Sequence, residues 1–293
     1  MRKNSQEIEA TLIICAENPL AVIGQIAGLT FLGSYRLLPQ EPQAIHDLYF
    51  DTPEGALQTQ KLALRVREIQ PMKIPAPDRS RIGRAEEHKL PIAETRAGCW
   101  LTLKGPSRPT DWGGMERLEI EAPWSEEALV RVTKALMDRG IGILSQHQGF
   151  DYAHPLEVMT GLGLKVIQDR ETHRQVRNIV SVGEEGSPVL AEMAIDTVVY
   201  HFGPQGVYHY EVEVEAKAES GSAVVKTVIE SLVAMYGPAL RRWDHDKLTT
   251  GQAIEKMLSE GALEGLLDGN GNLKPMAYDK IDAYLKRIER RRP

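Results

Sequence analysis

The sequence predicts an α+β protein built around an antiparallel β-barrel with a charged lining and helices outside it. In Tyr208–Lys217, Glu211, Glu213 and Glu215 alternate with apolar residues, which is the period of a strand with one charged face. The same alternation recurs along the chain with both signs of charge, segregated into acidic and basic strand faces. A polar-lined barrel accounts for these strands better than a sandwich with a dry core.

Inside a closed sheet, this charge pattern predicts a cation site that faces an anion site. Side chains two positions apart on a strand start ~6.5 Å from each other. Two carboxylates ~5 Å apart repel by ~3 kcal/mol at an effective dielectric of ~20, so they need a cation between them. The alternative is a half-exposed sheet with a solvated charged face, which is the better explanation for any single strand. Segregation of charge across six strands favours the barrel.

The first half of the chain is predicted to combine strands with two helices. The strands are expected at Glu7–Cys15, Ser34–Leu38, Ile45–Asp51, Leu62–Ile69, Cys99–Gly105 and Met115–Ala122. Asn18 and Pro19 are a typical N-cap and first residue of a helix, which we expect to end near Gly28. Ser125 is expected to cap a second helix that ends near Asp138.

The second half of the chain is again predicted to combine strands with helices. Gly163–Arg177 is predicted to hold a strand followed by a basic strand or loop, and Val189–Tyr200 a strand that forms a hairpin with Tyr208–Lys217. Ser220–Tyr236 has the apolar spacing of an amphipathic helix. Leu240–Gly251 is mixed in charge and lacks a period, so we expect it to be irregular.

Composition limits the function classes. The chain has 293 residues, of which 42% are hydrophobic and 26% charged, as in a soluble protein with a substantial core. Its net charge of −6 gives no basic field for nucleic acid. No apolar run approaches the ~20 residues of a membrane helix, and the first residues do not resemble a signal peptide. Cys15 and Cys99 fit neither a disulfide framework nor a zinc site. We expect a cytoplasmic protein without nucleic-acid or membrane partners.

Seven short motifs resemble, in order and approximate spacing, those of the CYTH superfamily. This superfamily of triphosphate tunnel metalloenzymes includes class IV adenylate cyclases, thiamine triphosphatases and inorganic triphosphatases. The motifs lie within about residues 6–251 and read EIE, HDLYFDTPEGALQTQKLALRVRE, CWLTLKGP, RLEIE, IQDRETHR, MAIDTV and YEVEVEAK. The resemblance implies an eight-stranded antiparallel tunnel in which acidic residues hold Mg²⁺ or Mn²⁺ and basic residues bind a triphosphate.

The resemblance also implies roles for individual residues. The implied metal ligands are Glu7, Glu9, Glu119, Glu121, Asp196, Glu211 and Glu213. The expected substrate-binding residues are Arg65, Arg67, Lys104, Lys165, Arg170, Arg174 and Lys247, and Lys104, Arg170 and Lys247 are also expected to be catalytic. Lys165 and Arg174 are included because they lie in the same basic segment as Arg170. Lys247 with Gly251 resembles a late SKYxxG-like motif, although Asp246 and Leu248 replace its serine and tyrosine.

Thr11 departs from the family pattern, because it stands where the ExExK signature has its lysine. Threonine supplies a hydroxyl but no fixed positive charge. The resemblance implies divalent-metal-dependent hydrolysis of inorganic triphosphate, a nucleoside triphosphate or thiamine triphosphate. The same set of acidic and basic residues could serve a class IV-type adenylate cyclase. It could also serve a non-catalytic protein that binds triphosphate or polyphosphate, and Thr11 favours this last alternative. A homodimer is compatible with each of these functions.

Two segments lie outside the strand pattern. Gln70–Gly98 is rich in proline and mixed charge and is expected to be a long loop inserted between two strands. Gln252–Pro293 is expected to be helical on both sides of a turn at Asp268–Asn272. The sequence therefore predicts a CYTH-like tunnel domain at residues 1–251, with an insertion at 70–98, and a helical C-terminal extension at residues 252–293.

Overall fold

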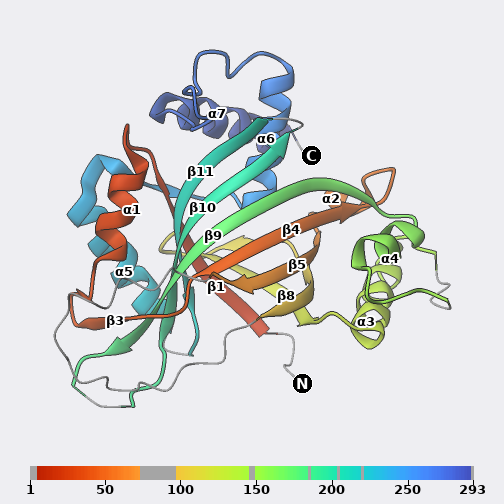
Figure 1. Ribbon diagram of the computed structural model, residues 1–293, viewed down its shortest axis with the longest axis horizontal. Coiled ribbons are helices and arrows are strands. Elements are labelled where there is room, and N and C mark those ends of the chain that lie inside the picture. Colours follow the sequence, from red (N-terminus) through yellow and green to blue (C-terminus); the bar gives the residue numbers. More distant parts are fainter. Residues whose placement is uncertain are drawn as a thin grey trace, which may run out of the picture.

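The structure is a computed structural model that describes residues 5–72, 97–144, 149–183, 186–202, 205–218 and 221–291. A curled antiparallel sheet occupies its centre, and helices lie around the sheet (Figure 1). The strands are β1 (Ser5–Ile14), β2 (Phe31–Leu32), β3 (Tyr35–Pro39), β4 (Gln43–Asp51), β5 (Ala63–Pro71), β6 (Gly98–Lys104), β7 (Arg108–Pro109), β8 (Met115–Pro123), β9 (Lys165–Ser181), β10 (Ala191–Phe202), β11 (Gln205–Ala216) and β12 (Leu240–Trp243). The α-helices are α1 (Pro19–Ala27), α2 (Ala56–Thr59), α3 (Glu126–Met137), α4 (Pro155–Gly161), α5 (Gly221–Tyr236), α6 (Lys247–Ser259) and α7 (Pro275–Arg291).

The main strands pair edge to edge, and every pairing is antiparallel. Their order is β10-β11-β1-β8-β6-β5-β4-β9, and β9 also pairs with β10 along Arg170–Ile179. The pairings therefore return to the strand at which they began. The short strands lie beside this circuit, with β3 on β9, β2 on β3, β12 on β1 and β7 on β8. The α+β class and the antiparallel sheet predicted from the sequence are confirmed.

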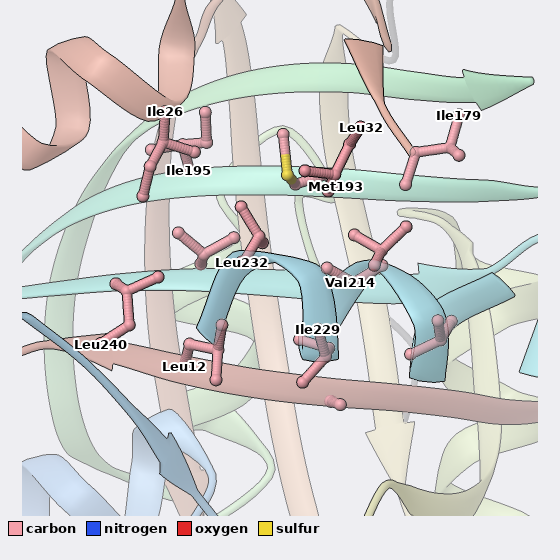
Figure 2. Close-up of a cluster of buried hydrophobic side chains, with 14 of the residues drawn as sticks. Leu12, Ile26, Leu32, Ile179, Met193, Ile195, Val214, Ile229, Leu232 and Leu240 are labelled. Carbon is pink, nitrogen blue, oxygen red and sulfur yellow. The ribbon is translucent and has the colours of Figure 1, made fainter. Parts of the chain in front are cut away.

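Apolar side chains on the outer face of the sheet pack against the helices. The largest cluster joins β1, β10 and β11 to α1 and α5, and Figure 2 shows Leu12 and Val214 beside Ile229 and Leu232 of α5. A second cluster joins β5 and β6 to α3 and α4. Burying each such side chain contributes about 1.5–3 kcal/mol, so the outer face supplies much of the stability. Away from the end that α6 and α7 cover, the inner face carries mainly polar residues.

Helices α6 and α7 form a third apolar cluster with one end of the sheet. Its strand residues include Ile13, Val198 and Tyr200, and Trp243 adds its ring from β12. In Figure 1 these two helices lie together beside the ends of β10 and β11, away from α1, α5, α3 and α4. Among the described residues, no helix combines the length and the hydropathy that crossing a membrane requires.

Most of the predicted elements are present, with boundaries that differ by a few residues. Asn18 and Ser125 cap α1 and α3 by accepting backbone N–H groups, as predicted. The irregular structure predicted for Leu240–Gly251 is wrong, because this segment forms β12 and the start of α6. Asp246 caps α6 by accepting the N–H of Thr249. The predicted loop at 70–98 lies mostly outside the described residues, since the structure describes none of 73–96.

Candidate functional site

A cavity of about 1650 Å³ follows the polar inner face of the curled sheet. It is larger than the ~300–1,000 Å³ typical of small-molecule sites. Strands from all sides of the circuit contribute to its lining, which includes Arg65, Arg67, Lys104, Glu119, Glu121, Arg170, Arg174, Glu211, Glu213 and Lys247. The period-2 alternation therefore brings predicted acidic and basic residues into one space.

Three carboxylates, which we call the acidic cluster, lie at the meeting of β10 and β11. One oxygen from each of Asp196, Glu211 and Glu213 lies within 4.8 Å of the others. The register places Asp196 directly opposite Glu211, and Glu213 follows two residues later on the same face. Carboxylate oxygens are the ligands that Mg²⁺ and Mn²⁺ prefer, so the donor set fits either ion.

Two basic residues contact the acidic cluster. Nζ of Lys247 contacts Glu211 and lies 3.1 Å from Glu213 and 3.4 Å from Asp196. Arg174 donates to both oxygens of Asp196, at 2.9 and 2.7 Å, and to Glu213 at 3.1 Å. Burial raises the pKa of Glu211, but Lys247 and a hydrogen bond from His209 outweigh it and bring this pKa to about 2. Glu211 is therefore ionised at neutral pH.

Lys247 reaches the cluster because α6 begins inside one end of the sheet. The hydroxyl of Tyr200 donates to the Lys247 carbonyl at 2.9 Å, and Nε2 of Gln168 donates to the Leu248 carbonyl at 3.1 Å. Gly251 permits this close approach, because a Cβ there would lie 2.2 Å from Nε2 of Gln168 and 2.5 Å from the Tyr200 ring. Steric fit therefore requires a glycine at position 251, which is the glycine of the late motif.

Three arginines around one aspartate form a second group, the basic cluster. Asp47 has no exposed surface and accepts from Arg67 at 2.7 and 2.9 Å. Arg170 also donates to Asp47, and Nε of Arg65 lies 3.6 Å from it. Burial raises the pKa of Asp47, but Arg67, Arg65 and Arg170 outweigh it, so the pKa lies well below its ordinary value. Asp47 is therefore a permanent counter-charge for the three arginines.

Arg170 keeps unused hydrogen-bond donors. Its Nη2 donates to Asp47 and to the Tyr49 hydroxyl, the latter at 2.9 Å. Its Nε and Nη1 are buried and have no hydrogen-bond partner among the residues that the structure describes. Leaving a buried charged donor unsatisfied costs more than ~1–3 kcal/mol. Arg170 lines the cavity, so an anion bound there would face a guanidinium with unsatisfied donors.

The other predicted residues are placed in four ways. Lys104 lies 3.4 Å from Glu119, and Arg65 lies 4.0 Å from Glu121, all at the cavity lining. The lining also includes Glu9, but this residue is outside the acidic cluster and pairs with Arg117 at 2.6 Å. Lys165 is exposed and donates to the carbonyl of Pro53, outside the cavity lining. The side chain of Glu7 lies outside the described part of the chain.

Sequence reasoning missed three residues of this site. Asp47 lies in the strand predicted at Ile45–Asp51, where it shares a face with Tyr49 and pairs with Arg67 in the register. Arg117 precedes Glu119 by two positions, so its inward direction could have been inferred from the same period. His209 likewise precedes Glu211 by two positions, and its side chain is fully buried.

Comparison with known proteins identifies the family. A sequence model of the CYTH domain matches residues 22–239. The chain belongs to the CYTH family. The CYTH resemblance predicted from the motifs is therefore confirmed, and the matched range contains the basic cluster and all three carboxylates of the acidic cluster. No curated protein matches the chain in sequence.

The CYTH chain is also similar to solved structures of low sequence identity. A putative adenylyl cyclase from Hippeastrum, described as having a dominant triphosphatase activity, is 17% identical, and the match covers 85% of this chain and 96% of that one with a TM-score of 0.45. A putative adenylate cyclase from Bacillus halodurans is 18% identical over 83% and 95% of the two chains, with a TM-score of 0.40. The RNA triphosphatase domain of a mimivirus mRNA capping enzyme is 10% identical over 80% and 89%, with a TM-score of 0.39.

Proposed function

We propose that this CYTH protein is a divalent-metal-dependent triphosphatase that hydrolyses inorganic triphosphate, a nucleoside triphosphate or thiamine triphosphate. The observation that carries the proposal is the guanidinium of Arg170, which has two buried donors without a partner among the described residues and belongs to a residue that lines the same cavity as Glu211 and Glu213. A single ligand that is anionic and also coordinates a metal ion could bind the basic cluster and the acidic cluster at the same time. Triphosphates have this chemistry.

The arginines of the basic cluster would bind the phosphate chain. A guanidinium matches phosphate oxygens with two parallel N–H donors, and Asp47 already holds Arg67 and Arg170 in fixed orientations. Because the donors are ordered before the substrate arrives, little side-chain entropy is lost on binding. The excess of three guanidiniums over one carboxylate makes this region attractive to an anion.

Asp196, Glu211 and Glu213 would hold the metal ion. A bound Mg²⁺ or Mn²⁺ would neutralise phosphate charge and activate the water that attacks the terminal phosphorus. Lys104, Arg170 and Lys247 would stabilise the negative charge that develops on the phosphate oxygens during transfer. Glu7, Glu9, Glu119 and Glu121 are proposed as further acidic ligands in the same cavity.

The eight-strand circuit is proposed as the family's tunnel, and the division into a tunnel domain at 1–251 and an extension at 252–293 remains a proposal. Helix α6 spans that boundary, since it runs from Lys247 to Ser259. A homodimer is likewise proposed and can be tested by light scattering.

A second candidate is a non-catalytic binder of triphosphate or polyphosphate. Thr11, which takes the place of the signature lysine, lines the cavity and pairs with Glu213 across β1 and β11. Its hydroxyl contributes no charge at a position where the family pattern has one. The residues that line the cavity would then bind the anion without supplying all of the positive charge that turnover requires.

A substrate screen separates these functions. Inorganic triphosphate, ATP and thiamine triphosphate are each incubated with Mg²⁺ or Mn²⁺, and released phosphate and cyclic AMP are measured separately. Metal-dependent phosphate release is expected for at least one substrate, and the variant Arg170→Gln should lose most of it. Cyclic AMP as the main product would indicate a cyclase, tight binding without turnover would indicate a binder, and neither binding nor turnover would refute the proposal.

A further inference from the structure

His209 is a buried partner of Glu211. Its Nε2 lies 2.8 Å from Oε2 of Glu211, and the imidazole has no exposed surface. The two residues are two positions apart on β11, so both side chains lie on the inner face of the strand. The acidic cluster therefore has a third contact, from His209 to Glu211, in addition to those from Lys247 and Arg174.

Helix α7 supplies the next group in this chain of contacts. The hydroxyl of Tyr278 lies 3.2 Å from Nδ1 of His209, and the two ring centroids are 5.6 Å apart. Tyr278 is fully buried, as are Ala277 and Ile281 of the same helix. Helix α7 is thus held by apolar packing that does not depend on the hydroxyl. It lies beyond the residues 22–239 that match the CYTH domain.

The donor and acceptor of each bond follow from the chemistry of the groups. An ionised carboxylate can only accept, so Nε2 of His209 donates to Glu211. In the tautomer that carries its hydrogen on Nε2, the ring accepts at Nδ1, and the Tyr278 hydroxyl donates to it. The two contacts together hold the ring of His209 in one orientation.

We propose that Tyr278 is a positioning residue that acts through His209 to orient the carboxylate of Glu211 for metal binding. The inference rests on one part of the proposed function, namely that the acidic cluster binds a divalent cation. A donor that holds one carboxylate oxygen presents the other oxygen in a single direction, and loss of such a supporting bond typically lowers metal affinity ~10–100-fold. Helix α7 is thereby a part of the metal site.

The first test removes one hydroxyl from the full-length chain. Tyr278→Phe keeps the ring and its packing but not the hydrogen bond to His209. Mn²⁺ affinity, measured by the electron paramagnetic resonance signal of free Mn²⁺, should fall about tenfold or more. Tyr236→Phe makes the same chemical change on α5, away from the cavity lining, and should leave Mn²⁺ affinity unchanged. Thermal unfolding of both variants identifies any general loss of structure.

The second test asks whether the effect passes through His209. In His209→Gln the amide nitrogen can still donate to Glu211, but no acceptor remains where Nδ1 was. In this background, adding Tyr278→Phe should change Mn²⁺ affinity less than about twofold, because the link is already broken. An equal loss in both backgrounds would mean that the hydroxyl acts through packing and would overturn the proposal, as would an unaltered Mn²⁺ affinity in Tyr278→Phe alone.

Metal binding and turnover are measured separately, so the two proposals can fail separately. A parent protein that binds Mn²⁺ but hydrolyses no triphosphate refutes the proposed activity, while the binding data still decide the role of Tyr278. A parent protein that binds no Mn²⁺ overturns the positioning role together with the metal site. A Tyr278→Phe variant with parental Mn²⁺ affinity and reduced turnover overturns the positioning role alone.

Discussion

The basic and acidic clusters bury charge in opposite ways. In the basic cluster, one carboxylate without exposed surface holds three guanidiniums, and Arg170 retains donors without a partner among the described residues. In the acidic cluster, three carboxylates surround the ammonium of Lys247, and Arg174 lies at their edge. Each arrangement leaves an excess of one sign, positive in the first and negative in the second.

Strand β9 connects the two clusters. Arg170 belongs to the basic cluster and Arg174 to the acidic one, and four residues on one strand span roughly 13 Å. Neither cluster is balanced internally, although unbalanced buried charge is costly. A ligand that brings an anion to one cluster and shares a cation with the other would balance both.

Asp47→Asn should have the largest effect, because it leaves three buried guanidiniums without their counter-charge. The free energy of unfolding at pH 7 should fall by about 3–5 kcal/mol. The three arginines depress the pKa of Asp47, so its contribution is complete above the ordinary value of about 3.9 and is lost as pH falls below it. Urea denaturation at pH 7 and pH 3 should therefore show a smaller pH dependence in the variant.

Asp169→Asn is the matched control for this prediction. Asp169 pairs with His46 at 2.8 Å, and both side chains are more than 40% exposed. Such a pair contributes at most about 1 kcal/mol. If the two aspartate variants lose equal stability, the basic cluster is not held by Asp47.

Glu213→Gln removes a carboxylate from the acidic cluster and should lower Mn²⁺ affinity by more than about 100-fold, since even supporting residues of metal sites are worth ~10–100-fold. Titration with Mn²⁺ measures the loss. Glu9→Gln sharpens the comparison, because Glu9 lies outside the cluster and pairs with Arg117. A comparable loss would support Glu9 as one of the further ligands proposed above, whereas an unchanged affinity would restrict the metal site to β10 and β11.

Arg67→Ala should weaken the binding of inorganic triphosphate by about 2–3 kcal/mol, because it removes a charged hydrogen-bond donor from the cavity. Calorimetry in the absence of divalent metal measures binding without turnover. Arg36→Ala deletes an exposed arginine on β3 and should leave the affinity unchanged. Equal losses in the two variants would indicate a general effect of net charge rather than a phosphate site.

Thr11→Lys should have the smallest effect. Thr11 pairs with Glu213 across the sheet, and Lys247 already lies 3.1 Å from that carboxylate. A second ammonium would compete for the same oxygens, so turnover should fall by less than about tenfold. A rise of ~10²–10⁴-fold would instead mean that the signature lysine is missing and that Lys247 does not replace it. Turnover and binding of the parent and the variant decide between the two.

Much of the sheet could be predicted because its period is local. In Tyr208–Lys217 the alternation correctly separated Glu211 and Glu213, which line the cavity, from Val212 and Val214, which are buried in the outer core. Helix starts could be predicted for the same reason, since Asn18 lies next to the turn that it caps.

The site was less predictable because its contacts join distant segments. Arg170 is 123 residues from Asp47, and no local pattern shows that the two side chains meet. Leu240–Gly251 lacks a clear period because its structure depends on β1 and on the interior side chains Gln168 and Tyr200. Its charges suggested an irregular segment, whereas tertiary contacts make it the segment that carries Lys247.

The pairing of β1 has a consequence for biosynthesis. This strand lies between β8 and β11 and also pairs with β12, so its partners are made long after it. At ~5–20 residues per second, synthesis from β1 to β11 takes roughly 10–40 s, during which at least one edge of β1 has no partner strand. We expect Glu7 and Glu9 to keep this nascent strand soluble. Aggregation of a chain that stops before β11, with and without Glu7→Val and Glu9→Val, measures how much these carboxylates protect it.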